Sequence, residues 1–160
     1  MGKTVISAPP GVPFVDITRA FEAPREAVFR AWTEPELVVQ WLGPRKYHME
    51  IERWDARDGG AYRYLHVDDA GNAHGFHGVF HGAPTPEAMV QTFEYEGAPG
   101  HVSLDSLVLE EHDGRTVARL HSVYQSVADR DAMVEAGMGD GVTEGFERLD
   151  ELVGRLAAVA

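Results

Sequence analysis

The strongest constraint on the fold is a long stretch, residues 47–124, in which apolar and polar side chains alternate with a period close to two. A period of two is typical of β-strands with one buried face. Clusters rich in Gly, Pro and Asp interrupt it at residues 58–60, 69–72, 82–84, 97–100 and 113–114. These turns delimit strands at about 47–55, 61–67, 73–81, 88–96, 101–111 and 115–124. Connections this short, without intervening helices, predict an antiparallel meander.

The last third of the chain has a helical period instead. From Met138 onward, apolar residues recur at spacings of three and four, namely Val142, Phe146, Leu149, Val153 and Leu156. This pattern predicts an amphipathic helix of about five turns. A shorter helix is expected to precede it, capped by Ser126 with Asp129 and ending near Glu135.

The N-terminal part predicts one more strand, at residues 14–22, followed by two short helices up to Pro44. Pro24 suits the first position of the first helix. Thr33 and Glu36 have the spacing of a capping box for the second helix. We expect residues 1–13 to form a flexible leader and residues 14–160 to form a single domain.

The order strand, two small helices, six strands and long helix predicts an α+β fold. In it, seven antiparallel strands bury the apolar stripe of the long C-terminal helix. Three glycines, Gly137, Gly141 and Gly145, lie near or inside this helix. Either the sheet approaches the helix closely there, or the glycines leave space for a bound molecule.

The composition excludes several classes of function. The formal net charge of -12 repels phosphate backbones and anionic membrane surfaces, so neither nucleic-acid binding nor membrane association is expected. No apolar run approaches the roughly 18 residues that a membrane span requires. The absence of cysteine rules out disulfides, thiol nucleophiles and thiolate metal sites. We therefore expect a cytoplasmic protein.

Histidines suggest a metal site at first sight, because His74, His77 and His81 lie close together in the sequence. In a strand, however, His74 and His77 point to opposite faces. His77 and His81 share a face but lie roughly 13 Å apart, too far for one ion. A site would need a cross-strand partner such as His66, and we expect neither a metal nor a cofactor.

Several short motifs, in order and at consistent spacing over residues 14–156, resemble one known family. They resemble the bacterial homologues of the heat-shock-protein-ninety ATPase activator, within the START-like (SRPBCC) superfamily. The matching residues are Arg19, Phe21, Ala23-Pro24-Arg25-Glu26, Val28-Phe29, Ala31-Trp32-Thr33, Pro35, Trp41, Pro44, Asp58-Gly59-Gly60, Tyr62-Arg63, Gly78-Val79, Asp113-Gly114, Thr116, His121, Gly141, Phe146, Leu149 and Leu152.

The resemblance implies a helix-grip fold, in which a curved antiparallel sheet grips the long C-terminal helix and leaves a cavity between them. Most members of the superfamily bind small hydrophobic ligands there. Some are polyketide aromatases or cyclases, and some sequester toxic natural products. Co-chaperone activity belongs to eukaryotic relatives with an additional N-terminal domain. Many relatives have Trp after the helix glycine, where this chain has Val142.

We therefore expect non-catalytic binding or sequestration of a small hydrophobic molecule, such as a lipid or polyketide, between the sheet and the C-terminal helix. The expected ligand-binding residues are Trp41, Tyr62, Tyr64, Phe76, Phe93, His121, Met138, Val142 and Phe146. No catalytic residue is assigned. Two alternatives stay open: an aromatase/cyclase-type enzyme using His121, a tyrosine and Arg19, and a protein-interaction module. A homodimer is also left open.

Overall fold

The structure is a computed structural model that describes residues 2–159, which form eight strands and four helices. In chain order the elements are β1 (Val5–Ser7), β2 (Phe14–Phe21), α1 (Arg25–Thr33), α2 (Pro35–Val38), β3 (His48–Trp54), β4 (Ala61–Val67), β5 (Ala73–His81), β6 (Ala88–Tyr95), β7 (Val102–His112), β8 (Arg115–Val123), α3 (Val127–Glu135) and α4 (Met138–Ala158).

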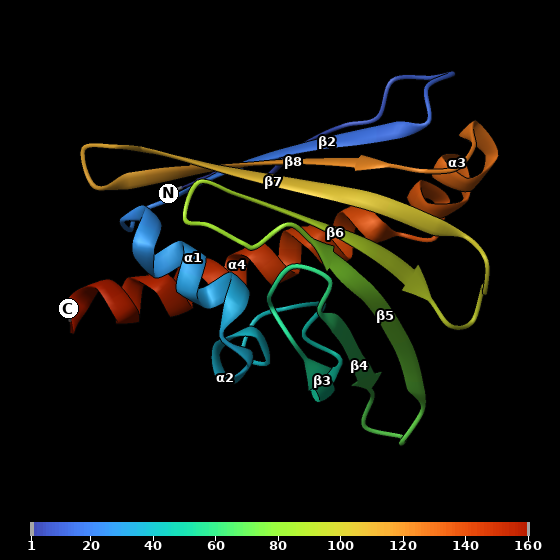
Figure 1. Cartoon of the computed structure of the whole chain (residues 1–160), viewed down its shortest axis with the longest axis horizontal. Helices are drawn as coiled ribbons and strands as arrows, with labels where there is room; N and C mark the ends of the chain where they lie inside the picture. The colour runs from blue at the N-terminus through green and yellow to red at the C-terminus, as the bar shows by residue number, and fades with distance from the viewer. Residues whose placement is uncertain (1, 160) are drawn as a thin grey trace.

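All eight strands belong to one antiparallel sheet with the order β1-β2-β8-β7-β6-β5-β4-β3. Strands β3 to β8 form the predicted meander, and β2 pairs with β8 over its whole length, with Ile17 opposite Leu120. Figure 1 shows the sheet bending between β8 and β3, with α4 running along it; α1 packs against α4, and α2 packs against α1. The predicted α+β helix-grip fold is confirmed.

The predicted count of seven strands is one too few. The additional strand, β1, pairs with β2, with Val5 opposite Thr18. Three residues are too few to show a period of two, so the sequence pattern did not reveal this strand. It lies within the predicted leader, residues 1–13, and it ties residues 5–7 to the edge of the sheet. Met1 of that leader and Ala160 of the predicted domain lie outside the described residues.

The capping box predicted for the second helix is wrong. Thr33 is the last residue of α1, and its hydroxyl donates a 2.8 Å hydrogen bond to the Phe29 carbonyl. Pro35 occupies the first turn of α2, and Glu34 is the N-cap without a side-chain capping bond. The proline therefore starts α2 one residue later than the capping-box spacing required. Pro24 is likewise the N-cap of α1 and not its first helical residue.

The two C-terminal helices form as predicted. Ser126 caps α3 by accepting a 3.0 Å hydrogen bond from the Asp129 backbone N–H. Gly137 has a φ of +88°, a conformation that favours glycine, and it separates α3 from α4. No helix within residues 2–159 is both long enough and apolar enough to cross a bilayer.

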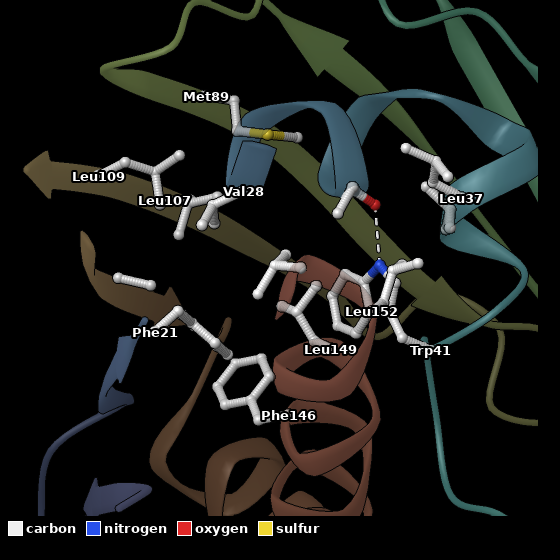
Figure 2. Close-up of a cluster of buried hydrophobic side chains, with 14 of the residues drawn as sticks. Phe21, Val28, Leu37, Trp41, Met89, Leu107, Leu109, Phe146, Leu149 and Leu152 are labelled. Atoms are coloured by element: carbon white, nitrogen blue, oxygen red, sulfur yellow. Dashed lines mark hydrogen bonds between the residues drawn. The ribbon is translucent and has the colours of Figure 1, made fainter. Parts of the chain in front are cut away.

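The core lies where α4 packs against α1 and the sheet. Phe146, with 3% of its surface exposed, places its ring 5.8 Å from the rings of Phe21 and Trp32. Trp41 is also buried, and its indole N–H donates a 2.8 Å hydrogen bond to the Ala31 carbonyl, drawn as a dashed line in Figure 2. This bond fixes the segment after α2 against α1, so that Trp41 reaches the helix–sheet interface.

Candidate functional site

A cavity of about 530 Å³ lies between the sheet and the first half of α4. Its lining comes from strands β2 to β8, from α1, from the 41–47 segment, and from residues 133–146 at the end of α3 and the start of α4. The lining residues are Ile17, Trp32, Trp41, Leu42, Gly43, Pro44, Tyr47, Trp54, Tyr64, His66, His74, Phe76, Met89, Gln91, Phe93, Tyr95, Ser103, Asp105, Ser106, Leu107, Leu120, Ser122, Tyr124, Met133, Ala136, Gly137, Met138, Gly141, Val142, Gly145 and Phe146.

One wall of the cavity is a row of stacked aromatic rings on three neighbouring strands. The centroids of Tyr64 and Phe76 are 5.2 Å apart with an interplanar angle of 22°. Phe76 and Phe93 follow at 5.5 Å and 24°. Offset stacking at these distances is favourable, and it leaves a broad apolar surface facing the cavity. The wall suits a flat, apolar molecule.

The structure brings most of the predicted ligand-binding residues to this cavity. Seven of the nine line it: Trp41, Tyr64, Phe76, Phe93, Met138, Val142 and Phe146. They come from the 41–47 segment, from β4, β5 and β6, and from α4. Their clustering depends on the curvature of the sheet, since the sequence separates them by up to 105 residues, from Trp41 to Phe146.

Tyr62 and His121 do not line the cavity. Tyr62 is a buried core residue whose hydroxyl donates a 2.6 Å hydrogen bond to the Thr92 carbonyl, and its burial raises the pKa of that hydroxyl. His121 lies half-exposed, with its Nδ1 2.6 Å from an Asp16 carboxylate oxygen. The expectation that His121 borders the cavity is wrong, because the inward residues of β8 are its neighbours Leu120 and Ser122.

Arg19, proposed as an acid or anchor in the enzyme alternative, is also absent from the cavity lining. It is buried on β2 and its guanidinium lies beside Asp150 of α4. Its role in the described structure is therefore to join the helix to the sheet.

A polar row that the sequence analysis did not single out crosses the cavity floor. Asp105 of β7 lies between its cross-strand partners Gln91 of β6 and Ser122 of β8. The Ser103 hydroxyl donates a 3.0 Å hydrogen bond to the Asp105 carboxylate. All four side chains line the cavity. The signal was available in the sequence, because Asp105 shares its strand face with the apolar residues Leu107 and Leu109.

The environment of Asp105 shifts its ionisation. Burial raises the pKa of its carboxyl from 3.8 to about 6, and hydrogen bonds from Ser122 and Ser103 partly oppose this rise. Burial also raises the pKa of the Tyr124 hydroxyl to about 12 and that of Tyr64 well above its ordinary value. Asp105 is therefore an acidic group surrounded by neutral neighbours.

The histidines do not assemble into one cluster. His66 lines the cavity, stacks on Tyr47 at 5.6 Å, and donates through Nε2 to the Leu42 carbonyl at 3.2 Å. Burial lowers the pKa of His66 to about 4, so the ring is neutral near pH 7. His77 instead lies 2.9 Å from Glu96 and does not line the cavity. Within residues 2–159, no group of three or more His, Asp or Glu side chains is placed to hold a metal ion.

Of the three glycines near or inside α4, only Gly145 is required for close packing. A Cβ at Gly145 would lie 3.3 Å from the Trp41 carbonyl oxygen and from the Gly43 nitrogen, a tight contact with backbone. A Cβ at Gly141 would lie 3.8 Å from Pro44, an ordinary contact. Close approach of the 41–43 segment therefore accounts for Gly145, and both glycines also line the cavity.

Comparisons with known proteins agree with this architecture. The family described as "Activator of Hsp90 ATPase homolog 1-like protein" matches residues 22–154. No curated protein sequence matches the chain significantly.

Similar folds are found among solved bacterial structures. A crystal structure of a Rhodobacter sphaeroides protein has a TM-score of 0.87 and 24% identity, covering 96% of this chain and 99% of that one. A solution structure from Arthrobacter aurescens has a TM-score of 0.87 and 22% identity, with coverages of 94% and 91%. Protein Ms6760 from Mycobacterium smegmatis has a TM-score of 0.84 and 19% identity, with coverages of 94% and 96%. At these identities the likeness shows the fold alone.

Proposed function

Because this chain belongs to the family of activator of Hsp90 ATPase homolog 1-like proteins, we propose that it binds or sequesters a small hydrophobic molecule in the cavity between the sheet and α4, without catalysing a reaction. The observation that carries this proposal is the cavity itself. Its volume of about 530 Å³ lies within the range of roughly 300–1,000 Å³ that is usual for small-molecule sites.

The chemistry of the lining supports an apolar ligand. Aromatic and aliphatic side chains form most of the walls, and a few polar groups converge on the floor around Asp105. This combination is typical of binding sites in which apolar walls supply affinity and a few polar groups set orientation. A lipid or a polyketide has a suitable apolar body, and sequestration of such a molecule in the cytoplasm remains our expectation.

The two alternative functions have less support. The enzyme alternative relied on His121, a tyrosine and Arg19. Tyrosines such as Tyr64 line the cavity, but neither His121 nor Arg19 does. An interaction module would be favoured by a filled interior combined with an apolar surface patch. The interior here retains a cavity of about 530 Å³, which favours ligand binding.

The test is a fluorescence titration with 9-anthracenemethanol, a neutral three-ring probe, against wild type and two variants. Val142→Trp places a larger ring in the cavity lining. Val108→Trp makes the same change on β7 at a position that is 42% exposed and absent from the lining. We expect Val142→Trp to weaken probe binding at least tenfold, about 1.4 kcal/mol, and Val108→Trp to leave it unchanged.

Thermal melting of the same three proteins separates binding from folding. Stability of Val142→Trp should hold or rise if the indole fills open space, whereas forcing it into a close-packed site would cost about 1–3 kcal/mol. If wild type binds neither this probe nor any member of a panel of hydrophobic compounds, and Val142→Trp is destabilised, the ligand-binding proposal is rejected.

A further inference from the structure

The carboxylate of Asp105 lies on the floor of the cavity. The sheet sets its position, since Gln91 and Ser122 are its direct cross-strand partners and all three line the cavity. The Ser103 hydroxyl, two residues away on the same strand face, holds one carboxylate oxygen at 3.0 Å. The carboxylate is therefore held in a defined place at the surface of an apolar cavity.

Among residues 2–159, no lysine or arginine side chain faces this carboxylate. The lining of the cavity contains no lysine or arginine, and no salt bridge to Asp105 is formed within residues 2–159. The lining histidine His66 donates to a backbone carbonyl instead, and His74 lies 3.1 Å from the Tyr95 hydroxyl. A carboxylate that is partly shielded from water and has no opposite charge beside it is unfavourable, so a ligand that supplies a positive charge gains from it.

The aromatic wall suits the same kind of ligand. Phe93 is the cross-strand partner of Ser103, and its ring belongs to the stacked row with Phe76 and Tyr64. Faces of aromatic rings attract cations, and a cation in a site shielded from water gains more from this than one at the surface. A charged nitrogen beside Asp105 therefore lies next to an aromatic wall that also packs against the ligand's apolar body.

We propose that Asp105 anchors a positively charged nitrogen, so that the ligands of this cavity are apolar amines, with a multi-ring or otherwise bulky hydrophobic body and one protonated nitrogen. This inference rests on the proposed function, because it names the class of ligand for the same cavity. A charge-assisted hydrogen bond from the nitrogen to the carboxylate sets the ligand's orientation. The apolar body then lies along the stacked rings and under the first turns of α4.

The experiment compares three probes that share one three-ring body and differ in charge. They are 9-(methylaminomethyl)anthracene, a cation near neutral pH, 9-(methoxymethyl)anthracene, which is neutral, and 9-anthracenecarboxylate, an anion. Fluorescence titration at pH 7.5 gives the dissociation constant of each with the wild-type protein. We expect the cation to bind at least about tenfold more tightly than the neutral probe, and the anion to bind most weakly.

Two matched variants test the role of the carboxylate. Asp105→Asn keeps the size and an acceptor for the Ser103 hydroxyl but removes the charge. Asp16→Asn makes the same chemical change beside His121, outside the cavity lining. Asp105→Asn should reduce the preference for the cation over the neutral probe to within about twofold, while Asp16→Asn leaves this preference unaltered.

The outcomes separate failure of the amine proposal from failure of the proposed ligand-binding function. Binding of all three probes with equal affinity would overturn the amine proposal and leave the binding function intact. Tighter binding of the anion would also overturn the proposal. If none of the probes binds, the amine proposal is rejected, whereas the proposed function is rejected only if the wider panel of hydrophobic compounds also fails to bind and Val142→Trp is destabilised. Because the wild-type comparison needs no variant, a poorly folded Asp105→Asn would not prevent the test.

Discussion

Arg19 of β2 and Asp150 of α4 form an ion pair across the helix–sheet interface, with Nη2 and Oδ2 3.7 Å apart. Arg19 is only 4% exposed, its guanidinium lies 5.0 Å from the Phe21 ring, and its Nη1 donates to the Ala20 carbonyl. Its Nε is buried without a hydrogen-bond partner among the described residues. Asp150 is therefore the main compensation for a buried positive charge, at a place that does not touch the cavity.

The first prediction concerns this pair. Asp150→Ala should lower the free energy of unfolding by about 1–3 kcal/mol, because it leaves the Arg19 charge buried and uncompensated. Glu147→Ala, at an exposed position of the same helix, is the control and should change it by less than about 0.5 kcal/mol. Urea unfolding measures both. Equal effects of the two changes would show that the pair contributes nothing.

The second prediction concerns the stripe of α4. Phe146→Ala should cost about 3–5 kcal/mol, because the ring packs edge-on against Phe21 and Trp32 and its removal leaves a void. Val159→Ala, where the side chain is 84% exposed, is the control and should have little effect. Chemical denaturation compares the variants. A loss below about 1 kcal/mol for Phe146→Ala would show that the stripe does not carry the packing.

The third prediction concerns pH. In the folded protein, burial raises the pKa of Asp105 from 3.8 to about 6. The folded state therefore binds more protons than the unfolded state between these values, and stability falls as the pH rises through this window. Asp105→Asn removes the free-energy cost of ionising this buried carboxyl in the folded protein. It should stabilise the ligand-free protein by about 1–3 kcal/mol at pH 7.5, and the gain should shrink toward zero near pH 4.

The difference in stability between wild type and Asp105→Asn reports the ionisation of Asp105 and not that of neighbouring groups. The titratable side chains that interact with it, Tyr62, Tyr64 and Tyr124, have raised pKa values and stay neutral throughout this range. The pKa of His66 is lowered to about 4, but this residue is present in both proteins, so its effect cancels to first order. Urea unfolding from pH 4 to 7.5 measures the difference. A gain that is independent of pH would contradict the raised pKa.

The fourth prediction concerns metals. After dialysis against zinc or nickel and removal of excess ion, elemental analysis should find less than about 0.1 ion per chain, because a structural site of this kind takes four ligands. His66 and His74 are cross-strand neighbours, but both rings are hydrogen-bonded within the cavity wall. One tightly held ion per chain, lost when both are replaced by alanine, would contradict the prediction.

Much of the fold could be predicted because its signals are local. The turns at Gly59, Gly71 and Gly114 adopt positive φ, and they delimit strands within one or two residues of the expected limits. Ser126 and Gly137 likewise mark where α3 begins and where it gives way to α4. Such signals depend on backbone conformation over a few residues, so neighbouring sequence suffices to identify them. The error at Thr33 arose where two local signals, a capping-box spacing and a proline, competed.

Part of the candidate site could also be predicted, but from hydrophobicity and not from local backbone signals. Large apolar residues such as Phe76, Phe93 and Phe146 were assigned to the interior because burial of apolar surface dominates folding. His121 was misplaced because β8 presents small or polar residues, such as Ala118 and Ser122, on its inward face and a valine, Val123, on its outward one. Alternation shows that a strand has two faces, but the polarity of these residues does not show which face points inward.

By itself, then, the sequence determined the order and limits of most elements, β1 and the start of α2 excepted, and the apolar stripe of α4, since these follow from local conformation and from periodicity. Only the tertiary structure decided that Gln91, Asp105 and Ser122 meet on the cavity floor and that Arg19 pairs with Asp150. These contacts join residues that are 14 to 131 positions apart in the chain. They depend on strand register and on how the curved sheet meets the helix, which no short segment specifies.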